Sequence, residues 1–312
     1  MKIEKKQINQ FIGFLVMFAC LFALFGISQF GEHVQAKEKN NLQLQQKKEE
    51  EKKQAQYDQD VEEIYQQIHT YLNEEEALND ESLGISFYDL SNERELSLNG
   101  DVIFEAASTT KVALAMLVVD KIQKDELSLD SELTYDSEDY EEGTGFIVNH
   151  PIEKKYSVRT LLNYMLVYSD NIATNMLYRE VGGRPTARKL IKENYLPDFD
   201  TTDNYLSANQ ARDLLIQLYE NLDENPLYPQ IIEWLKQTDF PIRLSTDQTI
   251  ANLAHKVGSV NNSIHDIGLF DVEHPYILTF YSTGLLNAEE EISTLSDKIY
   301  QLMTQDYPTG SN

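Results

Sequence analysis

Cysteine and basic residues are both scarce in this chain of 312 residues. The one cysteine, Cys20, excludes an intramolecular disulfide and any zinc site built from cysteines. Lys and Arg number 26 against 52 Asp and Glu, so the net charge is −26. A chain this acidic lacks the basic face that displaces counterions from phosphates, which excludes nucleic acid as a sequence-independent partner. The six histidines show no metal-ligand spacing, so no metal site is expected.

A nearly unbroken apolar run lies close to the N-terminus. No charged residue occurs between Lys6 and Glu32, and twenty residues of helix over 11–30 would rise about 30 Å, which spans a hydrocarbon core. Because lysines precede the run, residues 1–10 are expected in the cytoplasm, 11–30 as a transmembrane signal-anchor, and the rest on the extracellular side of the cell membrane. The alternative is a signal peptide cut after Ala36, with secretion of the remainder.

The next segment, 31–57, is mostly Lys, Glu, Gln and Asn and predicts a charged stalk. A short coiled coil is an alternative, but apolar heptad positions are too sparse to favour it. The folded domain is expected over 58–312, and apolar spacing over 61–72 predicts an amphipathic helix at its start.

Strands and helices then follow in an order that indicates the fold class. Alternating or apolar runs predict strands at 84–90, 95–98, 250–258, 265–272 and 275–283. Helical spacing and caps predict helices at 111–122, after Ser157, at 171–181, 185–194, 207–221 and 227–237, and after Asn287. Short turns between consecutive strands favour antiparallel pairing. We therefore expect an α+β fold, with a five-stranded antiparallel sheet flanked by helices and an all-helical lobe inserted in the middle.

The first chemical motif is S-x-x-K, formed by Ser108 and Lys111 at the start of the central helix. Positions i and i+3 share a helix face, so the hydroxyl and the amine can meet. The free N–H groups of a helix N-terminus suit a developing oxyanion. Burial should lower the pKa of the lysine, and a neutral amine can take the serine proton. Taken alone, the pattern favours an N-cap serine followed by a surface lysine.

Two further motifs follow in the chain. Ser169, Asp170 and Asn171 form S-D-N at a helix junction, and residues 256–259 read K-V-G-S on a predicted strand. In this order, the three motifs resemble those of class A β-lactamases and penicillin-binding proteins. The resemblance runs from about residue 60 to the C-terminus. Flanking features agree with it: Leu127-Ser128-Leu129, Gly143-Thr144-Gly145, Gly182-Gly183 and His265-Asp266-Ile267-Gly268.

The resemblance implies a role for each matching residue. Ser108 is expected to be the nucleophile that forms an acyl-enzyme, and Lys111 its base. Ser169 is expected to relay a proton to the leaving nitrogen, and Asn171 to hold the side-chain amide of the substrate. Lys256 is expected to supply positive charge for a substrate carboxylate and to lower the pKa of Lys111. This chemistry needs no cofactor.

The third motif departs from the family pattern, since Val257 stands where Thr or Ser is usual. The missing hydroxyl would bond a substrate carboxylate, and losing such a bond costs about 1.5–3 kcal/mol. Ser259 lies on the same strand face and is expected to replace the bond in part. Val257, Gly258 and Ser259 are therefore expected to contact substrate, and the N–H groups of Ser108 and Ser259 to form the oxyanion hole.

The second departure is the loop that carries the deacylation base. The E-x-x-L-N sequence of class A β-lactamases is absent between the second and third motifs. Asp198, Asp200 and Asp203 could stand in for its glutamate, although a surface turn is the favoured interpretation. Without a placed base, deacylation loses typically a hundred- to ten-thousandfold, so efficient β-lactam hydrolysis is not expected.

The sequence therefore predicts a membrane-anchored extracellular serine hydrolase or acyl-transferase. Its expected partner is a peptide-like acyl donor, such as cell-wall peptide or a related amide or ester, or a β-lactam. One alternative is a genuine β-lactamase with another deacylation base. The other is a non-catalytic domain that binds cell-wall material.

Overall fold

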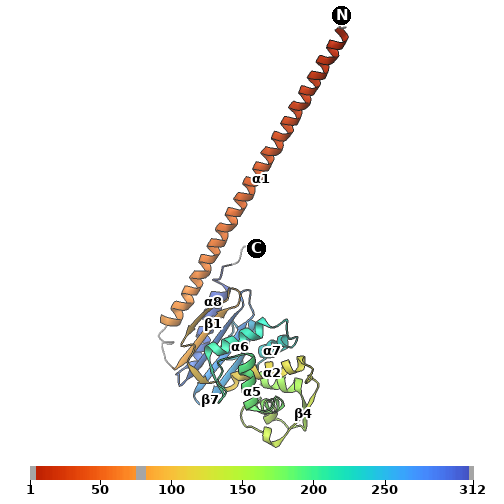
Figure 1. The fold of residues 1–312 in the computed structure, drawn as a ribbon. Coiled ribbons are helices and arrows are strands. Elements are labelled where there is room, and N and C mark those ends of the chain that lie inside the picture. Colours follow the sequence, from red (N-terminus) through yellow and green to blue (C-terminus); the bar gives the residue numbers. More distant parts are fainter. Residues whose placement is uncertain (1–4, 75–81, 309–312) are drawn as a thin grey trace. The chain divides into compact units, whose positions relative to one another are not determined.

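The computed structural model describes residues 5–74 and 82–308, and the chain divides into two units. One unit holds residues 1–62 and 308–312, and the other holds residues 63–307 (Figure 1). The predicted domain boundary near residue 58 and the stalk boundaries remain predictions. The residues 1–4 of the predicted cytoplasmic segment lie outside the described residues.

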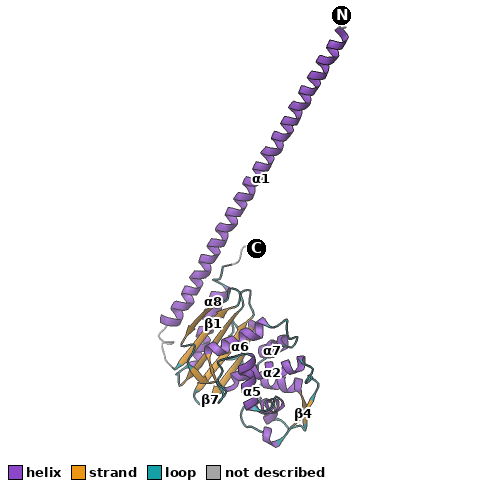
Figure 2. Ribbon diagram, in the orientation of Figure 1, coloured by secondary structure: helices purple, strands orange, loops and turns teal. Residues whose placement is uncertain are grey.

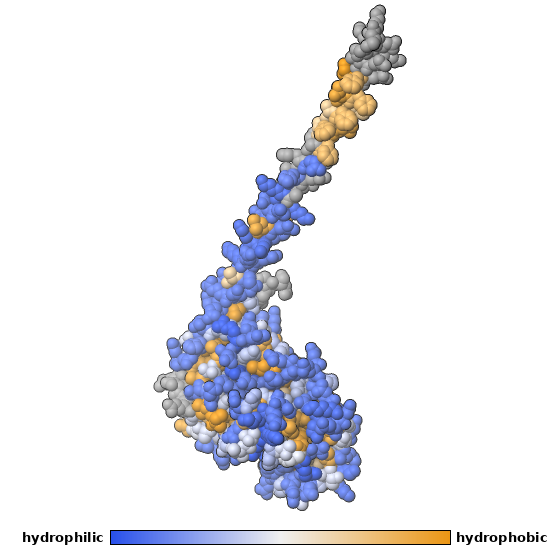
Figure 3. Space-filling model, in the orientation of Figure 1, coloured by the Kyte–Doolittle hydropathy of each residue, from blue (hydrophilic) through white to orange (hydrophobic). Residues whose placement is uncertain are grey.

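Helix α1, Lys5–Glu74, makes up the first unit and continues into the second. Figure 3 shows apolar side chains near one end of this helix and hydrophilic ones along most of the remainder. Among the described residues, no helix combines the length and the apolar character needed to cross a membrane, so the transmembrane anchor predicted over 11–30 is not supported. The two leucines of the predicted stalk, Leu42 and Leu44, are exposed on α1.

The centre of the second unit is an antiparallel sheet in the order β2-β1-β9-β8-β7. Its strands are β1 Leu83–Asp89, β2 Arg94–Leu98, β7 Leu253–Val260, β8 Ser263–Phe270 and β9 Tyr276–Thr283. The five-stranded antiparallel sheet predicted from the sequence is confirmed (Figure 2). β7 is an edge strand, so one side of its backbone is free to face another element.

Helices α6, Ala208–Glu220, and α8, Ala288–Thr304, pack on opposite faces of this sheet. On β9, the Thr279 hydroxyl donates to the Ala208 carbonyl of α6 at 2.9 Å. Tyr276 points to the other face, because it stacks on Phe270, whose ring contacts Tyr300 of α8. Strand residues separated by an odd number point to opposite faces, which explains the two layers.

The inserted lobe is mainly helical, but a small two-stranded sheet within it means that it is not all-helical as predicted. It contains α2 Lys111–Gln123, α3 Val158–Val167, α4 Asn171–Glu180, α5 Arg184–Asn194 and α7 Tyr228–Lys236. α2 contacts α3, α4, α5 and α7, and its first nine residues are all buried. An apolar helix of this kind is stable only when neighbours cover every side, which is why it lies at the centre of the lobe.

Two small sheets were not predicted from the sequence. β3 Ile103–Glu105 pairs with β6 Tyr205–Ser207, and β4 Glu132–Thr134 pairs with β5 Lys155–Ser157. Each strand has only three residues, too few to show a period-two pattern.

Two predicted ends differ from the structure. The strand expected from residue 250 begins at Leu253, because Ile250–Asn252 form the 3₁₀ turn η5. Asn287 precedes α8 with a left-handed backbone and makes no side-chain cap, unlike Ser157, whose hydroxyl accepts from the Thr160 N–H at 3.1 Å.

Candidate active site

Ser108 lies on a 3₁₀ turn, η2 Ala107–Thr110, and α2 begins directly after it at Lys111. The turn is reached through Ala107, whose φ of 50° lies in the left-handed region that alanine disfavours. Such strain persists only where the surroundings hold it, and it is concentrated at functional sites. Here the Thr109 hydroxyl bonds Tyr281 on β9 at 2.7 Å and anchors the turn to the sheet.

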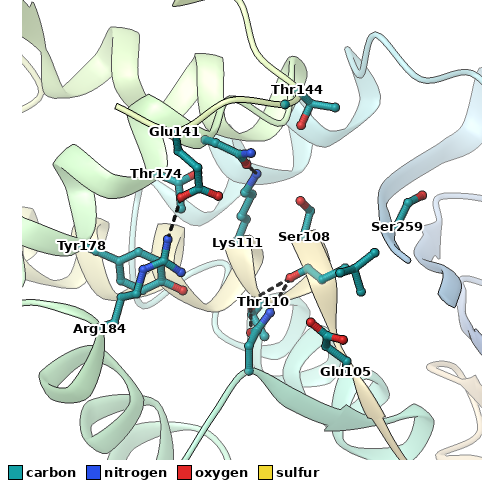
Figure 4. A pocket seen from close by; sticks show the side chains of 15 residues that line it. Glu105, Ser108, Thr110, Lys111, Glu141, Thr144, Thr174, Tyr178, Arg184 and Ser259 are labelled. Carbon is teal, nitrogen blue, oxygen red and sulfur yellow. Dashed lines mark hydrogen bonds and ion pairs between the residues drawn. The ribbon is translucent and has the colours of Figure 1, made fainter. Parts of the chain in front are cut away.

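The turn opens into a cavity of about 370 Å³. Four of the predicted site residues line it: Ser108, Lys111, Asn171 and Ser259. In the view of Figure 4, Ser108 stands between Lys111 and Ser259. The remaining lining residues are Glu105, Ala107, Thr110, Glu141, Gly143, Thr144, Thr174, Tyr178, Arg184, Asn204 and Val260.

The Lys111 amine has three acceptors around it. They are the Ser169 carbonyl at 2.7 Å, Asn171 Oδ1 at 2.9 Å and Ser169 Oγ at 3.2 Å. The expected meeting of Lys111 with Ser108 is not seen, and the Ser108 hydroxyl has no hydrogen bond to any described residue. A protonated amine would donate to all three acceptors, and a neutral amine, with two N–H bonds, to two of them. A catalytic hydrogen bond such as the one expected between Lys111 and Ser108 often forms only when substrate is bound.

Ser169 connects Lys111 to Lys256, which is completely buried. Its Oγ lies 3.2 Å from Lys111 Nζ and accepts a hydrogen bond from Lys256 Nζ at 3.1 Å. Ser169 and Lys256 do not line the cavity and lie beneath its wall. One hydroxyl thus contacts two amines, an arrangement that can pass a proton between Lys256 and Lys111.

Burial lowers the pKa of both lysines. For Lys111, burial has the largest effect and the charge of Lys256 adds to it, so its pKa lies well below the usual value despite the opposing Asp170 and Glu141. For Lys256, burial outweighs the attraction of Asp266, and Arg243 lowers the pKa further, to about 7. A neutral amine at Lys111 is what proton abstraction from a serine requires.

The S-D-N junction is held by Asp170, which is buried and caps α4. Its Oδ1 accepts from the Ala173 N–H at 2.8 Å, and its Oδ2 accepts from the Ile147 N–H at 2.6 Å. Ser169, like Ala107, has a left-handed backbone with φ of 53°. The carboxylate therefore fixes the strained turn and draws the segment after Gly145 against it. A Cβ at Gly145 would lie 2.6 Å from Asp170 Oδ2, so only glycine fits there.

The third motif brings the edge strand β7 against the turn that carries Ser108. A Cβ at Gly258 would lie 3.0 Å from the Ala106 carbonyl oxygen, so the glycine permits this close approach. Val257 is buried, and it and Gly258 do not line the cavity. Their contact with substrate stays a prediction, whereas Ser259 does reach the cavity.

Arg243 is a further cation at this edge that the sequence analysis missed. Its Nη2 donates to Ser259 Oγ at 2.6 Å, and its Nη1 donates to the carbonyls of Gly258 and His265. Ion pairing with Glu289 at 3.2 Å completes its contacts. Arg243 lies outside the three motifs and approaches Ser259 only through the fold, so sequence spacing gives no signal for it.

The acidic residues in the cavity also differ from expectation. Asp198, Asp200 and Asp203, considered as deacylation bases, do not line it, and Asp203 instead pairs with Arg188 on α5 at 3.0 Å. The carboxylates that do line it are Glu105 and Glu141. Neither belongs to a motif, and both reach the cavity from segments far from the predicted loop.

Comparison with known proteins identifies the family of this chain. Residues 63–303 match the family model described as the beta-lactamase enzyme family. The chain is 22% identical over 248 residues to beta-lactamase VEB-1 of Pseudomonas aeruginosa, covering 70% of this chain and 81% of that protein.

Solved structures share the fold at low identity. The structure of PBP-A superposes with a TM-score of 0.64 at 20% identity, covering 78% of this chain and 96% of that one. Beta-lactamase from Sphaerobacter thermophilus DSM 20745 superposes with a TM-score of 0.61 at 19% identity, covering 71% of this chain and 90% of that one. The chain therefore belongs to the beta-lactamase enzyme family and is a serine hydrolase.

Proposed function

We propose that Ser108 is the nucleophile of an acyl-transfer reaction and that Lys111 is its base. The observation that carries the proposal is the single hydroxyl of Ser169 between two buried amines beside Ser108. Ser108 Oγ attacks the carbonyl carbon, and its proton passes to the neutral Lys111. Ser169 then protonates the leaving nitrogen as the carbon–nitrogen bond breaks, and Lys256 resupplies Ser169. The product of this step is an ester on Ser108.

The backbone supports this assignment at the oxyanion. The N–H groups of Ser108 and Ser259 belong to the η2 turn and the edge strand, which Gly258 allows to approach closely. Two such donors stabilise the negative oxygen of a tetrahedral intermediate, and removing one typically costs a hundred- to a thousandfold in rate.

The substrate class follows from the charges at the Ser259 end of the cavity. Arg243 reaches Ser259 and Lys256 lies beneath the cavity wall, so this end suits a carboxylate on the donor. We propose a peptide-like acyl donor that ends in a carboxylate, such as cell-wall peptide, with β-lactams as mimics. A point mutant of PBP-A, which superposes with a TM-score of 0.64 at 20% identity over 79% of this chain and 97% of that one, was solved as an acyl-enzyme complex with penicillin G.

Slow deacylation is the second part of the proposal. Glu141, one of two carboxylates in the cavity, is engaged by Arg184 at 3.1 Å and by Asn175 at 2.9 Å. Asp198, Asp200 and Asp203 do not line the cavity, so the segment in place of the E-x-x-L-N sequence supplies no general base for water. We therefore propose a long-lived acyl-enzyme rather than a rapid β-lactamase.

A kinetic burst tests both parts. The full chain is mixed with excess penicillin G, and opening of the β-lactam ring is followed by absorbance. The expected trace is a burst of about one equivalent followed by slow turnover. Ser108→Ala should abolish the burst, and Ser137→Ala, a change on an outlying turn, should retain it. Linear turnover without a burst would contradict slow deacylation, and a burst in Ser108→Ala would contradict the nucleophile.

We also propose that the folded domain is exported from the cytoplasm. Support comes from the sequence alone, in the lysines at positions 2, 5 and 6 that precede the apolar run. Protease added to intact cells should digest an exported domain. Protection until the cells are lysed would contradict export.

A further inference from the structure

The cavity beside Ser108 continues into a second hollow beyond Lys111. The second hollow has a volume of about 700 Å³ and shares Glu141, Tyr178 and Arg184 with the first. In the view of Figure 4, these three residues lie together on the far side of Lys111 from Ser259. An acyl chain that leads away from a carbonyl at Ser108, opposite the carboxylate end, would reach them.

Glu141 and Arg184 are held in place by α4. Arg184 Nη2 lies 3.1 Å from Glu141 Oε2 and donates to Asn175 Oδ1 at 2.6 Å. Asn175 in turn donates to Glu141 Oε2 at 2.9 Å. The Arg184 guanidinium lies over the Tyr178 ring, 4.9 Å from its centre. Two opposite charges are thus fixed side by side before any ligand arrives.

Each charged group keeps unused bonding capacity toward the cavity. The described contacts engage only Oε2 of Glu141 and only Nη2 of Arg184. Oε1 of Glu141 and the Nε and Nη1 of Arg184 have no hydrogen-bond partner within the described part of the chain. The two side chains are 45% and 47% exposed, so a ligand can reach both.

The segment that follows α5 leaves this region open. Tyr195 turns away to Asp120, where its hydroxyl donates at 2.6 Å, and Asp203 is held by Arg188. Of residues 195–204, only Asn204 lines the cavity at Ser108, and none lines the second hollow. This segment therefore brings no carboxylate into either hollow and leaves the Glu141–Arg184 pair uncovered.

We propose that Glu141 and Arg184 form an acyl-side subsite that selects donors whose acyl chain ends in an α-amino-acid group. The ammonium of such a group pairs with Glu141 Oε1, and its carboxylate pairs with Nε or Nη1 of Arg184. A lone ammonium or a lone carboxylate is attracted by one member of the pair and repelled by the other. An end group with both charges on one carbon is attracted by both. The inference rests on the proposed acylation of Ser108 and names the donor for it.

Three matched penicillins test the subsite in the full chain. Each has a six-carbon side chain, which ends in a methyl group (hexanoyl), a carboxylate (adipoyl) or an α-amino carboxylate (aminoadipoyl). The second-order rate constant of acylation is measured by mass spectrometry. The aminoadipoyl compound should acylate about tenfold faster than either of the others, as expected when two half-exposed ion pairs each contribute a few tenths to one kcal/mol.

Variants assign the preference to the pair. In Glu141→Gln and in Arg184→Met, the ratio of aminoadipoyl to hexanoyl rates should fall to between one and three. A ratio within one protein cancels any change at Lys111, which serves every donor. Arg188→Met, one turn along α5 and outside both hollows, should keep the tenfold ratio.

The outcomes separate this inference from the function on which it rests. Equal rates for the three compounds in the native chain, or a tenfold ratio that survives in both variants, would overturn the subsite and leave acylation standing. Failure of all three compounds to acylate the chain would contradict the proposed function, and the subsite with it.

Discussion

Lys256 offers a sharp test of the electrostatics at the site, because burial keeps its pKa at about 7 against 10.5 for a free lysine. The unfolded chain therefore binds more protons than the folded chain between these two pH values. Unfolding takes up protons in this window, and proton uptake becomes less favourable as pH increases. The free energy of unfolding should therefore rise with pH. Below pH 7 both states carry the proton, and the penalty is constant.

The magnitude follows from the size of this window. Each unit of pKa difference corresponds to about 1.4 kcal/mol, so the change from pH 7 to pH 9.5 reaches about 3 kcal/mol. Lys256→Met removes the titrating amine and keeps most of the apolar volume. We expect the variant to be more stable than the native chain at pH 7, and the gap to shrink by about 3 kcal/mol by pH 9.5.

Urea unfolding of both proteins at pH 7, 8, 9 and 9.5 measures this gap. Subtracting the free energy of unfolding of one protein from that of the other at each pH cancels the contributions of groups that titrate alike in both. Lys189→Met, which removes an exposed lysine of α5, is the matched control and should show a gap that stays constant. A constant gap for Lys256→Met, or a gap that widens with pH, would refute the reasoning.

Three further substitutions test the architecture of the site and its support. Gly258→Ala places a Cβ 3.0 Å from the Ala106 carbonyl oxygen, so the strand and the Ser108 turn must separate by a few tenths of an ångström, and the rate of acylation by penicillin G should fall about tenfold; an unchanged rate would show that the close approach is unnecessary. Asp170→Ala leaves two buried N–H groups without an acceptor and should lower the free energy of unfolding in urea by about 2–4 kcal/mol, and a loss below 1 kcal/mol would argue against this cap. Tyr65→Phe removes a donor to the buried Asp89 carboxylate and keeps the ring, so we expect the free energy of unfolding in urea to fall by about 1–2 kcal/mol. No change would show that water replaces the hydroxyl.

The central sheet and the helices were predictable because their patterns are strong and local. α2 is apolar almost all round, and a helix of that kind has no stable place except the interior. The pairing of β7, β8 and β9 follows from three apolar runs joined by short turns. The three-residue strands β3 to β6 have too few residues for a pattern and form only because tertiary packing brings them together.

At the site, motif residues could be predicted and their neighbours could not. Ser108, Lys111 and Asn171 share one cavity because the motifs fall at a helix start and a helix junction. Arg243 and Glu141 enter from unrelated segments, and only the folded chain shows what they contact. A serine and a lysine at i and i+3 indicate proximity, but they do not reveal that Ser169 and Asn171 are the acceptors for the amine.

The most direct test of the account is the intact mass of the full chain after incubation with penicillin G. We predict a persistent increase equal to the mass of one penicillin molecule in the native protein. Ser108→Ala, handled identically, should show no increase. An unmodified native protein, or an adduct of the same mass on Ser108→Ala, would contradict the claim that Ser108 is an acylating nucleophile.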